Sequence, residues 1–98
     1  MSKSYNGWTN YETWATALWI DNEESTYHER QALAQSFKQD EDDPDSVADV
    51  AGYAVRLRDW VQNELMPDLG ASLAADLLGA ALSEINWHEI AESWLEEE

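Results

Sequence analysis

Apolar residues in this chain recur at intervals of three and four, the spacing of one face of an α-helix. The clearest case is the segment 11–19, where Tyr11, Trp14, Ala15, Leu18 and Trp19 recur at helical spacing on one face. Thr9 and Glu12 have capping-box spacing at its start, with Asn10 as a competing N-cap. No segment shows sustained alternation of apolar and polar residues with turn signals, and a strand pair near the N-terminus is the one alternative that stays open. We therefore expect an all-α fold.

About five helices are expected, packed as a small bundle in a single domain that spans residues 1–98. The predicted helices cover about residues 11–22, 24–38, 46–65, 69–82 and 86–95. Residues 1–8 form an irregular lead-in, and residues 40–45 form an acidic loop. Asp45 or Ser46 can cap the third helix, and Pro67 ends it.

Tryptophan supplies much of the expected core. The chain has 98 residues and six tryptophans, and each tryptophan can bury about 200 Å². A chain of this length has a modest core, so each large apolar side chain matters. Trp14, Trp19, Trp87 and Trp94 lie on the predicted apolar helix faces. We therefore expect these four side chains to be buried.

The net charge restricts the partners that the chain can bind. Twenty-one acidic residues and five basic residues give a formal charge of −16. Direct nucleic-acid binding needs a basic surface that neutralises phosphates, so it is excluded. Docking on an anionic membrane is disfavoured for the same reason.

Residue types that carry catalysis or bind metals are scarce. The absence of cysteine excludes disulfides, thiolate chemistry and cysteine-ligated zinc. His28 and His88 have no zinc-site spacing, and residues 40–45 lack the ligand pattern of an EF-hand. We expect no catalytic residue, no metal and no cofactor, and therefore no enzyme.

The localisation expected from the sequence is cytoplasmic. The first residues lack the apolar region of a signal peptide. The most apolar stretch, residues 69–82, is too short to cross a bilayer.

Two segments carry a recognisable pattern. Residues Tyr5–Trp14 read Tyr-Asn-Gly-Trp-Thr-Asn-Tyr-Glu-Thr-Trp and are followed by Leu18-Trp19 and Asp21-Asn22. This pattern resembles a family of small, largely uncharacterised proteins of phages, plasmids and other mobile elements that open with a Trp-Thr-Asn-Tyr-Glu-Thr-Trp signature. The stretch Ile85–Glu92 resembles the C-terminal element of that family. The resemblance implies a small accessory protein, with host defence as a plausible target.

The acidity suggests a DNA-mimic inhibitor of a host defence protein, of the anti-restriction or anti-CRISPR type. Duplex DNA carries one charge per about 1.7 Å, so sixteen charges match about 27 Å of duplex. A compact domain of this length has a radius of gyration near 13 Å and spans about that distance. The candidate phosphate mimics are Asp40, Glu41, Asp42, Asp43, Asp45 and Asp49, with Glu23 and Glu24 nearby in sequence. The partner would be a basic DNA- or RNA-binding protein or nuclease complex of the host.

Two alternatives explain other features of the sequence. In a halophilic accessory protein the acidity is an adaptation to salt, which screens the self-repulsion. In a protein-interaction module an aromatic patch of Trp8, Tyr53 and Trp60 would face a partner, which could be a second copy in a homodimer. Tyr53 and Trp60 suit this role because they lie off the centre of the apolar stripe of the third helix.

Overall fold

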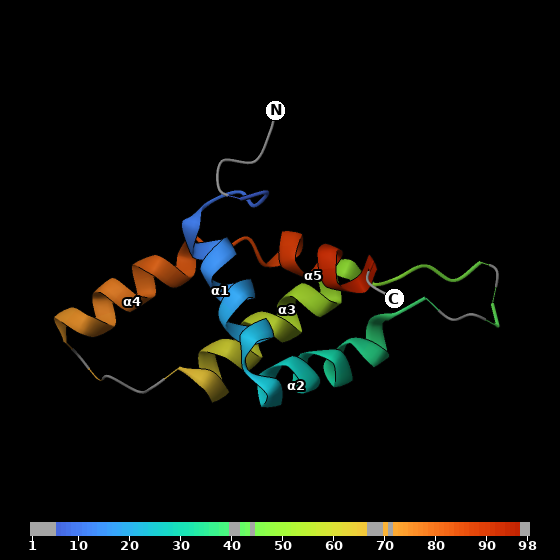
Figure 1. Cartoon of the computed structure of the whole chain (residues 1–98), viewed down its shortest axis with the longest axis horizontal. Coiled ribbons are helices and arrows are strands. Elements are labelled where there is room, and N and C mark those ends of the chain that lie inside the picture. Colours follow the sequence, from blue (N-terminus) through green and yellow to red (C-terminus); the bar gives the residue numbers. More distant parts are fainter. Residues whose placement is uncertain (1–5, 40–41, 44, 67–69, 71, 97–98) are drawn as a thin grey trace.

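The computed structural model describes residues 6–39, 42–43, 45–66, 70 and 72–96, and within them the fold is all-α, with five helices (Figure 1). The helices are α1 (Tyr11–Asn22), α2 (Glu24–Ala34), α3 (Val50–Trp60), α4 (Leu73–Ser83) and α5 (Trp87–Glu96). A 3-10 turn, Gln35–Phe37, extends α2, and a π-helical turn, Val61–Leu65, extends α3. The predicted fold class is therefore confirmed.

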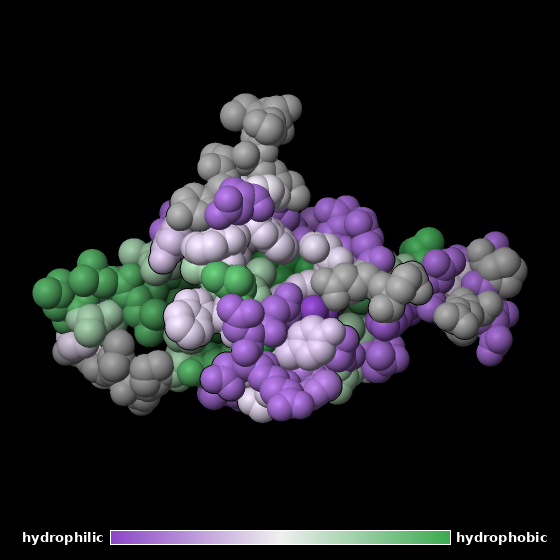
Figure 2. Space-filling view, in the orientation of Figure 1, coloured by the Kyte–Doolittle hydropathy of each residue, from purple (hydrophilic) through white to green (hydrophobic). Residues whose placement is uncertain are grey.

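The molecule is elongated, and its two ends differ in chemistry. Its principal extents are 49 × 32 × 23 Å, and its radius of gyration is 14.5 Å. Helix α4 projects at one end of the long axis, and the connection between α2 and α3 projects at the other (Figure 1). Figure 2 shows apolar residues over α4 and mostly hydrophilic residues at the opposite end.

The centre of the fold is the pair α3 and α5, which pack together more extensively than any other two helices. Helix α3 contributes the fully buried side chains of Tyr53, Leu57 and Trp60. Helix α5 adds Ile90 and Trp94 from the other side. The expectation that Trp94 belongs to the core is thus confirmed.

The predicted inner face of α1 is wrong. The side chains that α1 buries are Thr13, Ala17 and Ile20. Trp19 is 71% exposed, and Leu18 is 39% exposed, although both were expected in the core. Apolar residues surround most of this helix, so their spacing could not identify the face that packs. The small side chains Thr13 and Ala17 allow the closer approach of neighbouring helices.

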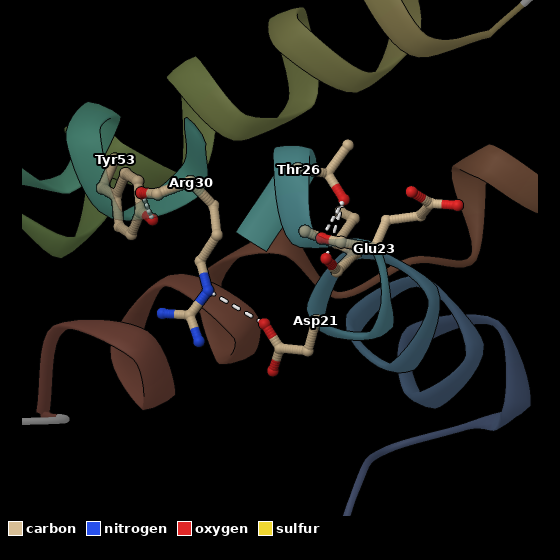
Figure 3. A network of polar contacts seen from close by, with 6 residues as sticks. Asp21, Glu23, Thr26, Arg30 and Tyr53 are labelled. Atoms are coloured by element: carbon tan, nitrogen blue, oxygen red, sulfur yellow. Dashed lines mark hydrogen bonds and ion pairs between the residues drawn. The ribbon is translucent and has the colours of Figure 1, made fainter. Parts of the chain in front are cut away.

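Arg30 joins α2 to three other helices, and Figure 3 shows its contacts with Asp21 and Tyr53. Its side chain is only 3% exposed, and its Nε lies 2.9 Å from Asp21 Oδ1 of α1. Its guanidinium carbon lies 4.4 Å from the ring centroid of Trp94 in α5 and 5.0 Å from that of Tyr27. The Tyr53 hydroxyl of α3 donates to the Arg30 carbonyl oxygen at 2.7 Å. A buried arginine needs such partners, because an unpaired buried charge is costly.

Hydrogen bonds join the start of α1 to the start of α5. Asn10 is the N-cap of α1, and its Oδ1 accepts from Thr13 N at 2.9 Å and from Thr13 Oγ1 at 2.6 Å. Thr13 Oγ1 in turn accepts from Asn86 N at 2.8 Å. Asn10 Nδ2 donates to the carbonyl oxygen of Glu84 at 2.7 Å. Residues 10 and 13 therefore hold the chain segment that leads into α5.

Glu89 completes this set of contacts, which we call the clasp. Its carboxylate accepts from Thr9 N at 3.1 Å, and the residue is buried. Of the two N-caps that the sequence offers for α1, Asn10 is confirmed and the capping box of Thr9 and Glu12 is wrong, because the Thr9 N–H donates to Glu89. Asn86 caps α5 as expected, with its Oδ1 accepting from Glu89 N at 3.0 Å. The clasp thus links the two segments that carry the recognisable sequence pattern.

Helices α3 and α4 begin later than the sequence predicted. Asp49, rather than Asp45 or Ser46, caps α3, and its carboxylate accepts from Gly52 N at 2.9 Å. The Asp49 N–H donates to Phe37 O at 2.8 Å, which fixes the position of this cap beside the end of α2. Ser72 caps α4, so that helix begins at residue 73.

The clasp predicts a large effect of a small change at Thr13. Replacing Thr13 by Val keeps the shape of this fully buried side chain and removes its hydroxyl. The Asn86 N–H then loses its acceptor, so the free energy of unfolding should fall by about 2–3 kcal/mol. The matched control is Thr16→Val, whose hydroxyl donates to Glu12 O within the same helix and should cost less than about 1 kcal/mol. Urea denaturation measures both, and equal losses would contradict the role of the clasp.

Candidate functional site

The acidic loop lies at one end of the molecule. Asp42, Asp43, Asp45 and Asp49 are all exposed there, whereas Asp40 and Glu41 lie outside the described residues. Between Lys38 and Arg56 the sequence contains no basic residue. The described carboxylates of this segment therefore form an exposed patch with no cation among them in sequence.

Local hydrogen bonds order part of this loop. Asp43 Oδ1 accepts from Asp45 N at 3.0 Å, and the Asp43 carbonyl oxygen accepts from Ser46 N at 3.0 Å. Asp49 is held by its bond to Gly52 N at the start of α3. Two of the carboxylates thus act in the local fold as well as carrying charge.

Glu23 and Glu24 do not join the acidic loop. Both are exposed, but they lie at the corner between α1 and α2. The 11 residues of α2 separate that corner from the chain that leads into the loop, a distance of about 16 Å along the helix. Glu24 Oε2 lies 3.7 Å from His28 Nε2 on the same helix. The eight predicted phosphate mimics therefore do not form one continuous patch.

The predicted aromatic patch is wrong. Tyr53 and Trp60 are both 0% exposed, and Trp8 is half-buried and packs against the core. The cause is the central position of α3, which packs against both α5 and α2. Side chains that lie off the centre of its apolar stripe are covered by these neighbours. None of the three is available as the exposed anchor that we expected.

The exposed apolar surface lies instead on α1 and α4. Helix α4 buries none of its residues, and Leu73 and Leu77 are 75% and 63% exposed. On α1, Tyr11 and Trp19 are more than half exposed. These four side chains, together with the groove described in the next paragraph, form a surface that we call the apolar face. The part of it on α4 lies at the apolar end of the molecule in Figure 2.

A groove of about 470 Å³ runs between α1, α4 and the π-helical turn that follows α3. Its lining is mostly apolar and includes Trp19, Ile20, Val61, Leu65, Leu78 and Leu82. Glu12 and Glu23 contribute its two carboxylates. Sequence reasoning missed this surface because it assigned the apolar residues of α1 to the core. The sequence feature that could have indicated this surface is the segment 69–82. It is apolar around most of its helical circumference, and a chain this short has few other helices to cover it.

Neither a membrane span nor a metal cluster is found in the described part of the chain. No helix there is long and apolar enough to cross a bilayer. Over the same residues, no three histidine, aspartate or glutamate side chains are grouped so that they could hold a metal ion. The features that remain as candidate sites are the acidic loop and the apolar face.

Comparison with protein families gives a match over nearly the whole chain. The model of a family of unknown function, DUF7249, matches residues 1–97. The chain belongs to this family. No curated protein and no solved structure matches the chain. The DUF7249 match includes the clasp, the acidic loop and the apolar face, so all three lie within the family's domain.

Substitution of glycine by alanine should have opposite effects on stability at two helical sites of this DUF7249 protein, Gly79 in α4 and Gly52 at the start of α3. Glycine to alanine inside a helix usually stabilises by about 0.5–1 kcal/mol. At Gly79 an added Cβ meets no atom within 4 Å, so Gly79→Ala should stabilise by that amount. At Gly52 the Cβ would collide with the capping carboxylate of Asp49 and approach Phe37. Gly52→Ala should therefore destabilise by roughly 1–3 kcal/mol. Urea denaturation of both variants tests this, and stabilisation by Gly52→Ala would contradict it.

Proposed function

We propose that this protein is a non-catalytic inhibitor that occupies the basic nucleic-acid-binding surface of a host defence protein. The observation that supports this most is the acidic loop, where Asp42, Asp43, Asp45 and Asp49 are exposed within a stretch of sequence that contains no basic residue. The protein would act in the cytoplasm, where such defence complexes meet nucleic acid. It would need no cofactor and no catalytic residue.

The charge per unit length is compatible with nucleic-acid mimicry. Sixteen net charges over a long axis of 49 Å correspond to roughly one charge per 3 Å. This is about half the density of duplex DNA, at one charge per about 1.7 Å, and close to that of one strand, at about 3.4 Å. The long axis exceeds the 27 Å of our compact estimate, so the charge is spread more thinly along the molecule than along duplex DNA.

The local hydrogen bonds of the loop favour binding by a preformed surface. Asp43 accepts from Asp45 N, and Asp49 accepts from Gly52 N, so two carboxylates have defined positions before any partner arrives. A charge that is already ordered loses less conformational entropy when it binds. These carboxylates would pair with arginine and lysine side chains that otherwise contact phosphate.

The proposal implies a strong dependence of binding on salt. Attraction between an acidic loop and a basic groove acts over the Debye length, which is about 10 Å at 0.1 M salt. It raises the rate of association at low salt and weakens as salt is added. Duplex DNA should compete for the same basic groove.

Removal of the loop charges tests this proposal. The variant carries Asp42→Asn, Asp43→Asn and Asp45→Asn, which remove three charges and preserve the size of each side chain. The natural partner is first captured from host extract with the wild-type protein and purified. Its affinity for the variant should be about 10–100-fold lower than for wild type at about 0.1 M salt, because each close charge pair contributes on the order of a kcal/mol.

The matched control removes three charges elsewhere. Glu29→Gln, Asp59→Asn and Glu92→Gln alter exposed carboxylates outside the loop and give the same net charge. This control should lose less than about threefold in affinity, since distant surface charges are screened. A captured partner that duplex DNA does not displace, or equal losses in the two triple variants, would contradict the proposal.

A further inference from the structure

We propose that the apolar face formed by α1 and α4 is the interface of a symmetric homodimer. This inference does not rest on the inhibitory role of the acidic loop, because it concerns the opposite end of the molecule (Figure 1). It rests on the exposure of α4, the low charge of that helix, the shape of the groove and the position of the acidic loop.

The described residues of the chain do not bury helix α4. It has 11 residues, and none of them is buried. Isolated helices shorter than about 12–15 residues are marginal in water, and most helices in proteins are stabilised by packing of their apolar face. In α4 both the outward residues, such as Leu73 and Leu77, and the groove residues, such as Leu78 and Leu82, are apolar. A second surface packed against the outward residues would supply the missing burial.

The chemistry of the face indicates an apolar occupant. The chain has 21 acidic residues, yet Asp76 is the only charged residue within α4. A cationic partner would be matched by many carboxylates along its binding site, and this face offers three, Asp76 of α4 and Glu12 and Glu23 at the groove. A second copy of the same apolar helix matches the surface better. Burial of apolar area then supplies the driving force for association.

The face is self-complementary in shape. Leu73 and Leu77 project from α4 as a ridge and do not line the groove, whereas Leu78 and Leu82 of the same helix do line it. In a two-fold dimer the ridge of each copy can enter the groove of the other, which makes the same contact twice. Trp19, 71% exposed and part of the groove lining, would be covered by the ridge of the second copy.

The position of the acidic loop permits two copies of so acidic a chain to associate at this face. The loop and α4 lie at opposite ends of the 49 Å long axis (Figures 1 and 2). A dimer joined through α4 would therefore hold its two loops far apart. The Debye length at physiological salt is about 8 Å, so repulsion between the loops would be almost fully screened.

The exposed area is sufficient for a reversible dimer. Tyr11, Trp19, Leu73 and Leu77 are each more than half exposed. Together they would bury on the order of 500 Å² per copy, judged from the area of aromatic and leucine side chains. The walls of the groove add to this, which approaches the roughly 800 Å² per partner of a standard interface. We therefore expect a dissociation constant in the micromolar range.

Sedimentation equilibrium of the full chain tests the homodimer. The mass should rise from 11.2 kDa towards twice that value as the protein concentration increases through the micromolar range. Salt should strengthen the dimer, because it screens repulsion between two chains of charge −16. A mass of 11.2 kDa at all concentrations up to about 1 mM and at all salt concentrations would overturn the proposal.

Substitutions distinguish this interface from any other. Leu77→Glu changes an exposed residue to a good helix former and should weaken the dimer at least about 100-fold, because the contact occurs twice. Leu77→Ala should weaken it about tenfold and keeps helix propensity high. The matched control is Val47→Glu, at a residue that is 79% exposed near the acidic loop and should change the constant less than about threefold. A dimer that both Leu77 variants leave unchanged would overturn the assignment of the interface.

Discussion

The ion pair between Arg30 and Asp21 is the interaction on which the arrangement of the helices depends. A charged arginine side chain that is 3% exposed requires a carboxylate and aromatic faces around it, and these come from different helices. Asp21 fixes the end of α1, Trp94 fixes α5, and the carbonyl oxygen of Arg30 receives the hydroxyl of Tyr53 from α3. One residue of α2 therefore sets the positions of the other three helices that form the core. Helix α4 makes none of these contacts, although its Leu82 packs, partly buried, against the core.

The molecule therefore has a well-packed centre and two ends that differ in polarity. The clasp adds a second set of constraints, because it holds the start of α1 against the start of α5. The acidic loop projects from one end of this framework, and α4 projects from the other end. The DUF7249 match over residues 1–97 includes the framework and both ends. The framework therefore holds an acidic surface and an apolar surface at opposite ends of the molecule.

The sequence predicted the helices well and their faces less well. Helical spacing is a local property, so the fold class and the approximate extents of α1, α2 and α5 followed from it. The face that α1 buries depends on which helices pack against it. Because α1 has apolar residues around most of its circumference, the sequence pattern alone does not determine that face. Tyr53 is a similar case, because its burial follows from α5 and α2 packing on both sides of α3. The exposure of the acidic carboxylates Asp42, Asp43 and Asp45 was predictable, because aspartate side chains are rarely buried in proteins.

Amide hydrogen exchange as a function of protein concentration tests the central claim most directly: the Arg30-centred framework is stable alone, and α4 is completed by a second copy. In dilute protein we predict that the amides of α3 and α5 exchange only on global unfolding, whereas those of residues 73–83 exchange close to the rate of an unprotected chain. At concentrations above the dissociation constant of the dimer, the amides of residues 73–83 should become protected. Protection of α4 equal to that of α3 at every concentration would contradict the claim.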